Sequence, residues 1–110
     1  MAWMALIVAG IFEIVWAFSM KLSDGFTKPL ATAVTLAAMI ISFALLSFSM
    51  RSIPLGTAYT IWTGIGALGA FALGIVWLNE PASAMRVIAA ILIIAGLVMM
   101  KMASPGQDAY

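Results

Sequence analysis

The sequence contains neither cysteine nor histidine, and only 8% of its residues are charged. These absences exclude disulfides, the Cys and His clusters of zinc sites and the nucleophile–histidine arrangements of hydrolases. Five Lys and Arg against four Asp and Glu leave a net charge of +1, too small for the basic surface that binds nucleic acid. We therefore expect no metal, no cofactor, no nucleic-acid partner and no enzymatic activity.

Apolar residues, in contrast, make up 65% of the 110 residues. Soluble domains average roughly 45–50% apolar and about 25% charged residues, so a soluble fold of this length could not bury so much apolar surface. The composition indicates an integral membrane protein. The first apolar stretch has no basic residue before it and contains Glu13, which is not typical of a signal peptide, so we expect it to be part of the mature protein.

Four apolar runs lie between charged or turn-forming residues, and each is close to the about 20 residues that a helix needs to cross a bilayer. They cover residues 2–20, 29–50, 57–78 and 82–103, and a polar tail follows over 104–110. Ser23-Asp24-Gly25 and Asn79-Glu80-Pro81 are turn signals, and Pro29 and Pro81 suit the first turns of the second and fourth helices. Because lipid offers no partners to backbone amides, we expect a single all-α domain of four transmembrane helices.

Lys and Arg are distributed almost evenly between the two ends of such a bundle. With both termini on one side, Arg51 and Lys101 fall on that side, and Lys21, Lys28 and Arg86 fall on the other. Since orientation follows the excess of these charges, either the count is too small to be informative or the chain inserts in both orientations. Insertion both ways predicts an antiparallel homodimer, whose symmetry would resemble the inverted repeats of many transporters.

Glu13 is the only acidic residue within a predicted span, near the middle of the bilayer. Ionisable residues at that depth are costly and usually mark ion, proton or substrate pathways. No Lys or Arg lies deep enough to neutralise Glu13, so its carboxyl can exchange a proton for a cation; the alternative is a neutral structural carboxyl. Gly10 and Trp16 share its helical face, where Gly10 permits close approach and the Trp16 indole can donate a hydrogen bond or face a cation.

Other polar and small residues are candidates to line the same site. Ser42 lies near the middle of the second span, where it could reach Glu13 and orient it. The third span contributes Tyr59, Trp62 and Thr63, followed by Gly64 and Gly66. Because glycine is unfavourable inside a helix, the pair indicates either close packing or a bend. The fourth span has no polar side chain between its flanking charges, and we expect it to pack in the dimer.

The run Pro-Leu-Gly-Thr-Ala-Tyr-Thr-Ile-Trp-Thr-Gly-Ile-Gly over residues 54–66, with the lone glutamate in the first of four short helices, resembles the small multidrug resistance transporters. The resemblance covers essentially the whole chain. The segment Phe-Glu-Ile-Val-Trp-Ala over residues 12–17 and Lys101 are similar to the guanidinium exporter subtype; the polyaromatic-drug subtype typically has a small residue where Trp16 stands. Thr60 departs from the alanine more usual after that tyrosine.

The resemblance implies a multi-pass protein of the bacterial inner membrane, an antiparallel homodimer in lipid that exports guanidinium and small guanidinyl cations. Protons and substrate would compete for Glu13 of both subunits. Trp16, Ser42, Tyr59 and Trp62 match positions that orient the glutamate and line the pocket in this subtype, and Gly10 matches its close-approach glycine. The alternatives are a polyspecific exporter of quaternary ammonium and lipophilic cations, a non-transporting membrane subunit and a cation channel.

Overall fold

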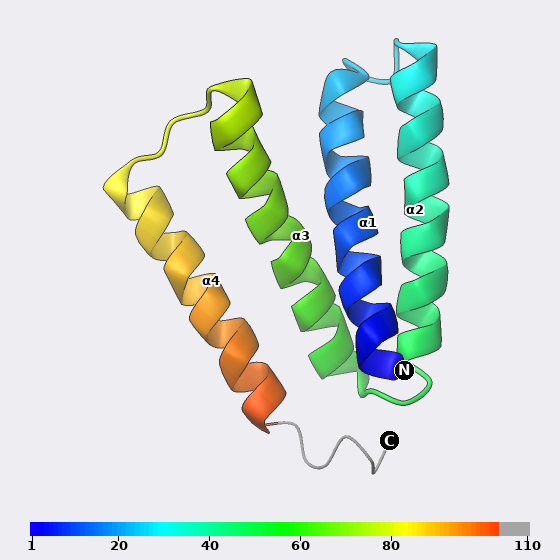
Figure 1. The fold of residues 1–110 in the computed structure, drawn as a ribbon, viewed down its shortest axis with the longest axis vertical. Coiled ribbons are helices and arrows are strands. Elements are labelled where there is room, and N and C mark those ends of the chain that lie inside the picture. The colour runs from blue at the N-terminus through cyan, green and yellow to red at the C-terminus, as the bar shows by residue number, and fades with distance from the viewer. Residues whose placement is uncertain (104–110) are drawn as a thin grey trace.

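A computed structural model describes residues 1–103 and contains four helices (Figure 1). They are α1 (Ala2–Leu22), α2 (Pro29–Ser49), α3 (Leu55–Leu78) and α4 (Ala84–Ala103). Every helix begins and ends within two residues of its predicted span, and residues 1–103 contain no strand. The prediction of an all-α, four-span chain is confirmed, whereas the expected polar tail over 104–110 lies outside the described residues.

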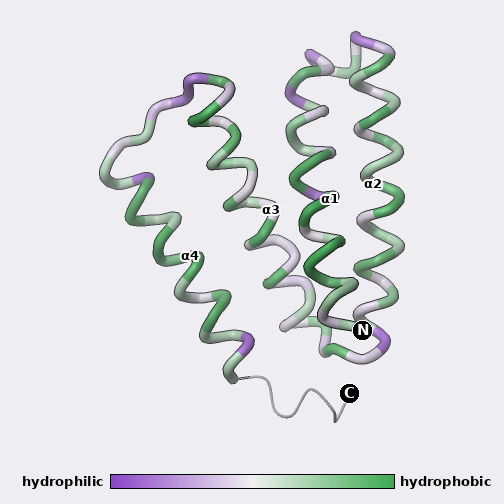
Figure 2. The backbone as a smooth tube through the Cα atoms, viewed as in Figure 1, coloured by the Kyte–Doolittle hydropathy of each residue, from purple (hydrophilic) through white to green (hydrophobic). Residues whose placement is uncertain are grey.

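The length of the helices matches the thickness of a bilayer. They contain between 20 and 24 residues, which corresponds to about 30–36 Å at 1.5 Å per residue, and the hydrocarbon core is about 30 Å thick. All four are long and apolar enough to cross a membrane. Figure 2 shows the strongly polar stretches mainly at the helix ends and connections, with apolar residues covering most of each helix.

The α1 helix occupies the centre of the packing. It lies between α2 and α3, while the α4 backbone approaches that of α3 alone (Figure 1). Small buried residues, Ala9 on α1 and Ala38 and Ser42 on α2, let α1 and α2 approach closely. The buried apolar cluster combines Leu6 and Ala9 of α1 with residues of the other elements, namely Leu46, Ile53, Ala58, Ile61 and Trp62. This cluster holds α1, α2 and α3 together around the middle and the N-terminal end of α1.

The connections at one end of the bundle are shaped by residues in the left-handed region. Between α1 and α2, positive φ occurs at Asp24, Gly25 and Phe26 (51°, 73° and 66°), which agrees with the predicted turn. The Ser23 hydroxyl stabilises this turn, because it accepts a hydrogen bond from the Phe26 amide at 3.0 Å. Pro29 begins α2, as expected.

The connection between α3 and α4 corrects one prediction. Asn79 ends α3 with a positive φ of 56°, but Pro81 does not lie in the first turn of α4, which begins at Ala84. The Glu80 amide bonds back to the Gly74 carbonyl at 3.0 Å, so Asn79 and Glu80 complete the end of α3 and cannot cap the next helix. Ser83 caps α4 instead, because its hydroxyl accepts a hydrogen bond from the Arg86 amide at 3.3 Å.

The α4 helix is the least covered part of the chain. None of its residues is buried, although most are large and apolar. It meets α3 where the Leu97 side chain lies against Gly64, and a Cβ at position 64 would overlap that side chain. Near its two ends, Arg86 and Lys101 lie over the rings of Phe71 and Trp3, while many of the large apolar side chains of α4 are exposed.

Candidate functional site

Glu13 lies on α1 with its carboxyl directly against the backbone of α3. The contact is at Gly66, which is buried, and a Cβ at that position would overlap the Glu13 carboxyl. Glycine therefore allows the α3 backbone to lie against the carboxyl. Of the two alternatives for Gly66, close packing or a bend, this structure shows close packing. The α3 helix is uninterrupted from Leu55 to Leu78, so the bend at Gly64 and Gly66 stays a prediction for other states of the protein.

Besides Nε1 of Trp3 near its start, two polar groups of α1 are buried without a hydrogen-bond partner among residues 1–103. They are Oε1 of Glu13, an acceptor, and Nε1 of Trp16, a donor one helical turn farther along. Buried polar groups are usually paired, and an unpaired one carries a desolvation cost. A small polar cation bound beside Glu13 would remove this cost for the carboxylate.

Ser42 does not bond to Glu13 in this structure. Its fully buried hydroxyl donates to the Ala9 carbonyl at 2.7 Å and accepts from Nε1 of Trp62 at 3.0 Å. A hydroxyl has a single proton to donate, and here that proton is used by the α1 backbone. Ser42 thus joins α1, α2 and α3 in one network next to Glu13, and its predicted orienting role requires a different rotamer.

Aromatic rings form a row from α1 through α2 to α3. Trp16 meets Phe43 with ring centroids 6.3 Å apart, Phe43 meets Trp62 at 5.9 Å, and Trp62 meets Tyr59 at 5.6 Å. Phe43 was missed by the sequence reasoning, although its place next to the mid-span Ser42 was an available signal. The row gives the site several ring faces to which a cation is attracted.

The remaining candidates line the contacts that α3 makes with α4 and with α1. Tyr59, Thr63 and Gly64 line a hollow of about 480 Å³ between α3 and α4, together with Thr60. Gly10 faces Ile65 of α3, where a Cβ would come within 2.7 Å of the Ile65 Cγ2 atom. Within one chain, then, the structure brings Glu13, Gly66 and the Ser42–Trp62 pair close to the α1–α3 contact, and it places Thr63 in the α3–α4 hollow.

No charged group within residues 1–103 forms an ion pair with Glu13. Among the described residues the one ion pair joins Glu80 to Arg86, at 4.0 Å between Oε1 and Nη2. Lys101 lies over the Trp3 ring, 4.0 Å from its centroid, far along α1 from Glu13. The part of the chain that the structure describes contains no cluster of acidic residues that could hold a metal ion.

Comparison with known proteins finds similar sequences over nearly the whole chain. A family model described as "Small Multidrug Resistance protein" matches residues 1–94. The chain is 47% identical to a protein of Citrobacter freundii named "Guanidinium exporter", over 94% of this chain and 99% of that protein. Proteins of the same name from Yersinia pestis and Escherichia coli K12 are 48% and 45% identical, over 94% of this chain and 100% and 99% of their own lengths.

Proposed function

Because this chain belongs to the small multidrug resistance family, we propose that it exports guanidinium and small guanidinyl cations in exchange for protons. It is a multi-pass protein of the bacterial inner membrane and a transporter. The observation that carries the proposal is the Glu13 carboxyl, at mid-span, with its Oε1 atom buried and unpartnered within residues 1–103. Similarity to proteins named for guanidinium export supports the choice of substrate.

The chemistry of the site suits guanidinium. Its planar array of N–H donors matches the two oxygens of a carboxylate. The Oε1 atom of Glu13 has no hydrogen-bond partner within residues 1–103 and can accept such a bond. The rings of Trp16, Phe43 and Trp62 provide faces for the same cation. Quaternary ammonium ions have no N–H donors, so they would bind through the rings alone and leave the carboxylate oxygens without hydrogen bonds.

Competition between protons and substrate for Glu13 would couple the two movements. A negatively charged carboxylate is costly to move through lipid, so the site changes sides when it holds either a proton or a cation. Protons entering down their gradient then drive the substrate out of the cell. In a dimer the two Glu13 residues would share one site and titrate as a coupled pair.

An antiparallel homodimer accounts for the parts that a single chain leaves incomplete. The α4 helix has no buried residue, and a second copy would cover its apolar surface. The near balance of Lys and Arg between the two ends fits insertion in both orientations. Within such a dimer, Tyr59 and Thr63 of the α3–α4 hollow would line the shared pocket; the resemblance to the subtype implies this for Tyr59.

Transport currents from purified protein in proteoliposomes test this proposal. We expect guanidinium, but not a tetraalkylammonium ion, to produce current in the wild type, and Glu13→Gln to abolish it because an amide cannot exchange protons. Lowering the pH should raise the apparent KM for guanidinium by up to about tenfold per pH unit for each proton displaced. Asp24→Asn, which changes an exposed carboxyl in the α1–α2 connection, is the control and should leave the currents unchanged.

Persistence of proton-coupled current in Glu13→Gln would refute the mechanism. Large currents with the tetraalkylammonium ion would instead assign a polyspecific substrate range. A one-for-one exchange of protons for guanidinium carries no net charge, so the pH inside the vesicles is followed as well. The absence of both current and guanidinium-driven pH change, in vesicles shown to contain the folded dimer, would contradict transport by this chain alone.

A further inference from the structure

We infer that Glu80 forms a second cation site, a surface station where guanidinium-type substrates bind before or after they occupy Glu13. The station lies at the mouth of a hollow between α1 and α3. The inference rests on the proposed function, because it concerns the path of the same substrate. It assigns a binding role to the α3–α4 connection.

Glu80 is held against the last turns of α3 instead of extending into solvent. The left-handed backbone of Asn79 reverses the chain, and the Glu80 amide donates to the Gly74 carbonyl at 3.0 Å. Gly74 is buried, and a Cβ at that position would overlap the Glu80 carboxyl. Because residue 74 has no side chain, the Glu80 carboxylate can lie directly against the α3 backbone at this position.

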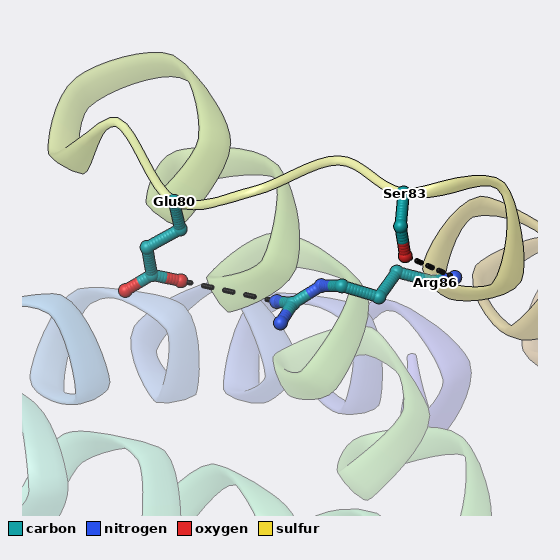
Figure 3. A network of polar contacts seen from close by, with 3 residues as sticks. All are labelled: Glu80, Ser83 and Arg86. Atoms are coloured by element: carbon teal, nitrogen blue, oxygen red, sulfur yellow. Dashed lines mark hydrogen bonds and ion pairs between the residues drawn. The ribbon is translucent and has the colours of Figure 1, made fainter.

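The carboxylate already faces a guanidinium group of the protein itself. Figure 3 shows the side chains of Glu80 and Arg86 pointing toward one another across α3, with 4.0 Å between Oε1 and Nη2 and side-chain exposures of 39% and 44%. A single contact at this distance and exposure is weak, so a free guanidinium can compete for the carboxylate. Arg86 has a second partner, because its Cζ atom lies 5.4 Å from the centroid of the Phe71 ring.

The hollow beside Glu80 has the size and lining for a small planar cation. It encloses about 160 Å³ and is lined by Ala17, Phe18, Lys21, Ala70, Leu78 and Glu80. A water molecule occupies about 30 Å³ in the liquid. Guanidinium, which has four non-hydrogen atoms, therefore fits in this volume. The lining includes an aromatic ring, Phe18, whose face can attract a cation. Lys21 opposes tight binding, and weak binding is what a station on a path requires.

The hollow lies about one helical turn from the contact between Glu13 and Gly66. Ala17 lies four residues from Glu13 on α1, and Ala70 lies four residues from Gly66 on α3, so both are one helical turn from the Glu13–Gly66 contact. Lys21 at the mouth is eight residues from Glu13, or about 12 Å along the helix. Along the α1–α3 contact, the hollow thus lies between the level of Glu80 and the level of Glu13, and Ala17 and Ala70 are its lining residues nearest to Glu13.

Guanidinium currents from proteoliposomes, recorded over a range of substrate concentrations, test the station. Glu80→Gln should raise the KM for guanidinium about fivefold with little change in the maximal current, because the loss of one exposed ionic contact changes affinity by about that factor. Arg86→Gln should lower the KM by about two- to threefold, because it frees the carboxylate from its internal competitor. The double variant should behave like Glu80→Gln, since Arg86 acts through Glu80.

Opposite changes of the KM in Glu80→Gln and Arg86→Gln distinguish a binding role of the pair from a structural one. If the pair merely holds the α3–α4 connection, both single variants impair transport in the same direction, and that result overturns the inference. Asp24→Asn and Lys28→Gln make matched charge changes in the α1–α2 connection at the same end of the bundle (Figure 1), and they should leave the KM unchanged. Equal shifts in these controls would show a general surface potential and would also overturn it. A wild type in which guanidinium produces neither current nor a pH change inside the vesicles refutes the proposed function itself, whereas transport with an unaltered KM in Glu80→Gln refutes the station alone.

Discussion

At the scale of single residues, Gly66 determines how α3 approaches the Glu13 carboxyl. Its lack of a side chain leaves the space that the carboxyl occupies, since a Cβ there would overlap the Glu13 side chain. Gly69 plays the same part for Ile14, the next residue on α1. Two consecutive α1 side chains are therefore seated against α3 backbone, and the direction of the Glu13 carboxyl follows from that packing.

Gly66→Ala should displace the Glu13 carboxyl and reduce guanidinium transport at least about tenfold, since small displacements of a functional group strongly reduce its effect. Initial rates in proteoliposomes measure this loss. Gly56→Ala is the matched control, because a Cβ at position 56 meets nothing within 4 Å, and it should transport normally. Normal rates in Gly66→Ala would show that the carboxyl has room to adjust and that Gly66 does not position it.

The position of Glu13 near the middle of a membrane-spanning helix was predictable from the sequence, whereas its immediate contacts were not. An acid near the middle of an apolar span stands out by depth alone. The Ser42 hydroxyl, by contrast, was placed correctly at mid-span, yet it bonds to Ala9 and Trp62. Which acceptor a rotating hydroxyl chooses depends on how closely two helices approach, and that distance is set by packing along their whole length.

At the scale of the helices, the four spans were predictable because charged and turn-forming residues separate uniform apolar runs. The start of α4 was not, because Pro81 fits the first turn of a helix by type but follows residues that complete the end of α3. Asn79 makes the difference, with its positive φ of 56°. From the sequence alone, an asparagine between two helices indicates only a turn. Whether it ends the first helix or begins the second depends on the backbone hydrogen bonds that its conformation permits.

Asn79→Ala should lower the free energy of unfolding by about 1 kcal/mol, because a Cβ without a polar group is disfavoured in the left-handed region. Asn79→Gly should leave it almost unchanged. Reversible denaturation of the detergent-solubilised protein, followed by tryptophan fluorescence, measures both. Helix propensity alone predicts the opposite order of stability, because alanine favours a helix more than glycine does. If Asn79→Ala were more stable than Asn79→Gly, the role of Asn79 in ending α3 would be contradicted.

At the scale of the whole molecule, Lys and Arg are divided almost evenly between the two ends of the bundle. Arg51 and Lys101 lie at the end with the N-terminus, and Lys21, Lys28 and Arg86 lie at the other, with Asp24 and Glu80 beside them. An antiparallel dimer would therefore present one copy of each end, and one Glu80–Arg86 pair, on either side of the membrane. Both the shared Glu13 site and the proposed surface station would then be reachable from both sides.

The absence of cysteine allows a direct test of this arrangement in cells, because single cysteines can be introduced into an otherwise thiol-free chain. Thr27→Cys lies in the α1–α2 connection and Ser52→Cys in the α2–α3 connection, at opposite ends of the bundle (Figure 1). If the chain inserts in both orientations, a membrane-impermeant maleimide should label about half of the molecules of each variant in intact cells, and nearly all of them after the membrane is permeabilised. Complete labelling of one variant and none of the other would establish a single orientation, and an antiparallel dimer could then not form.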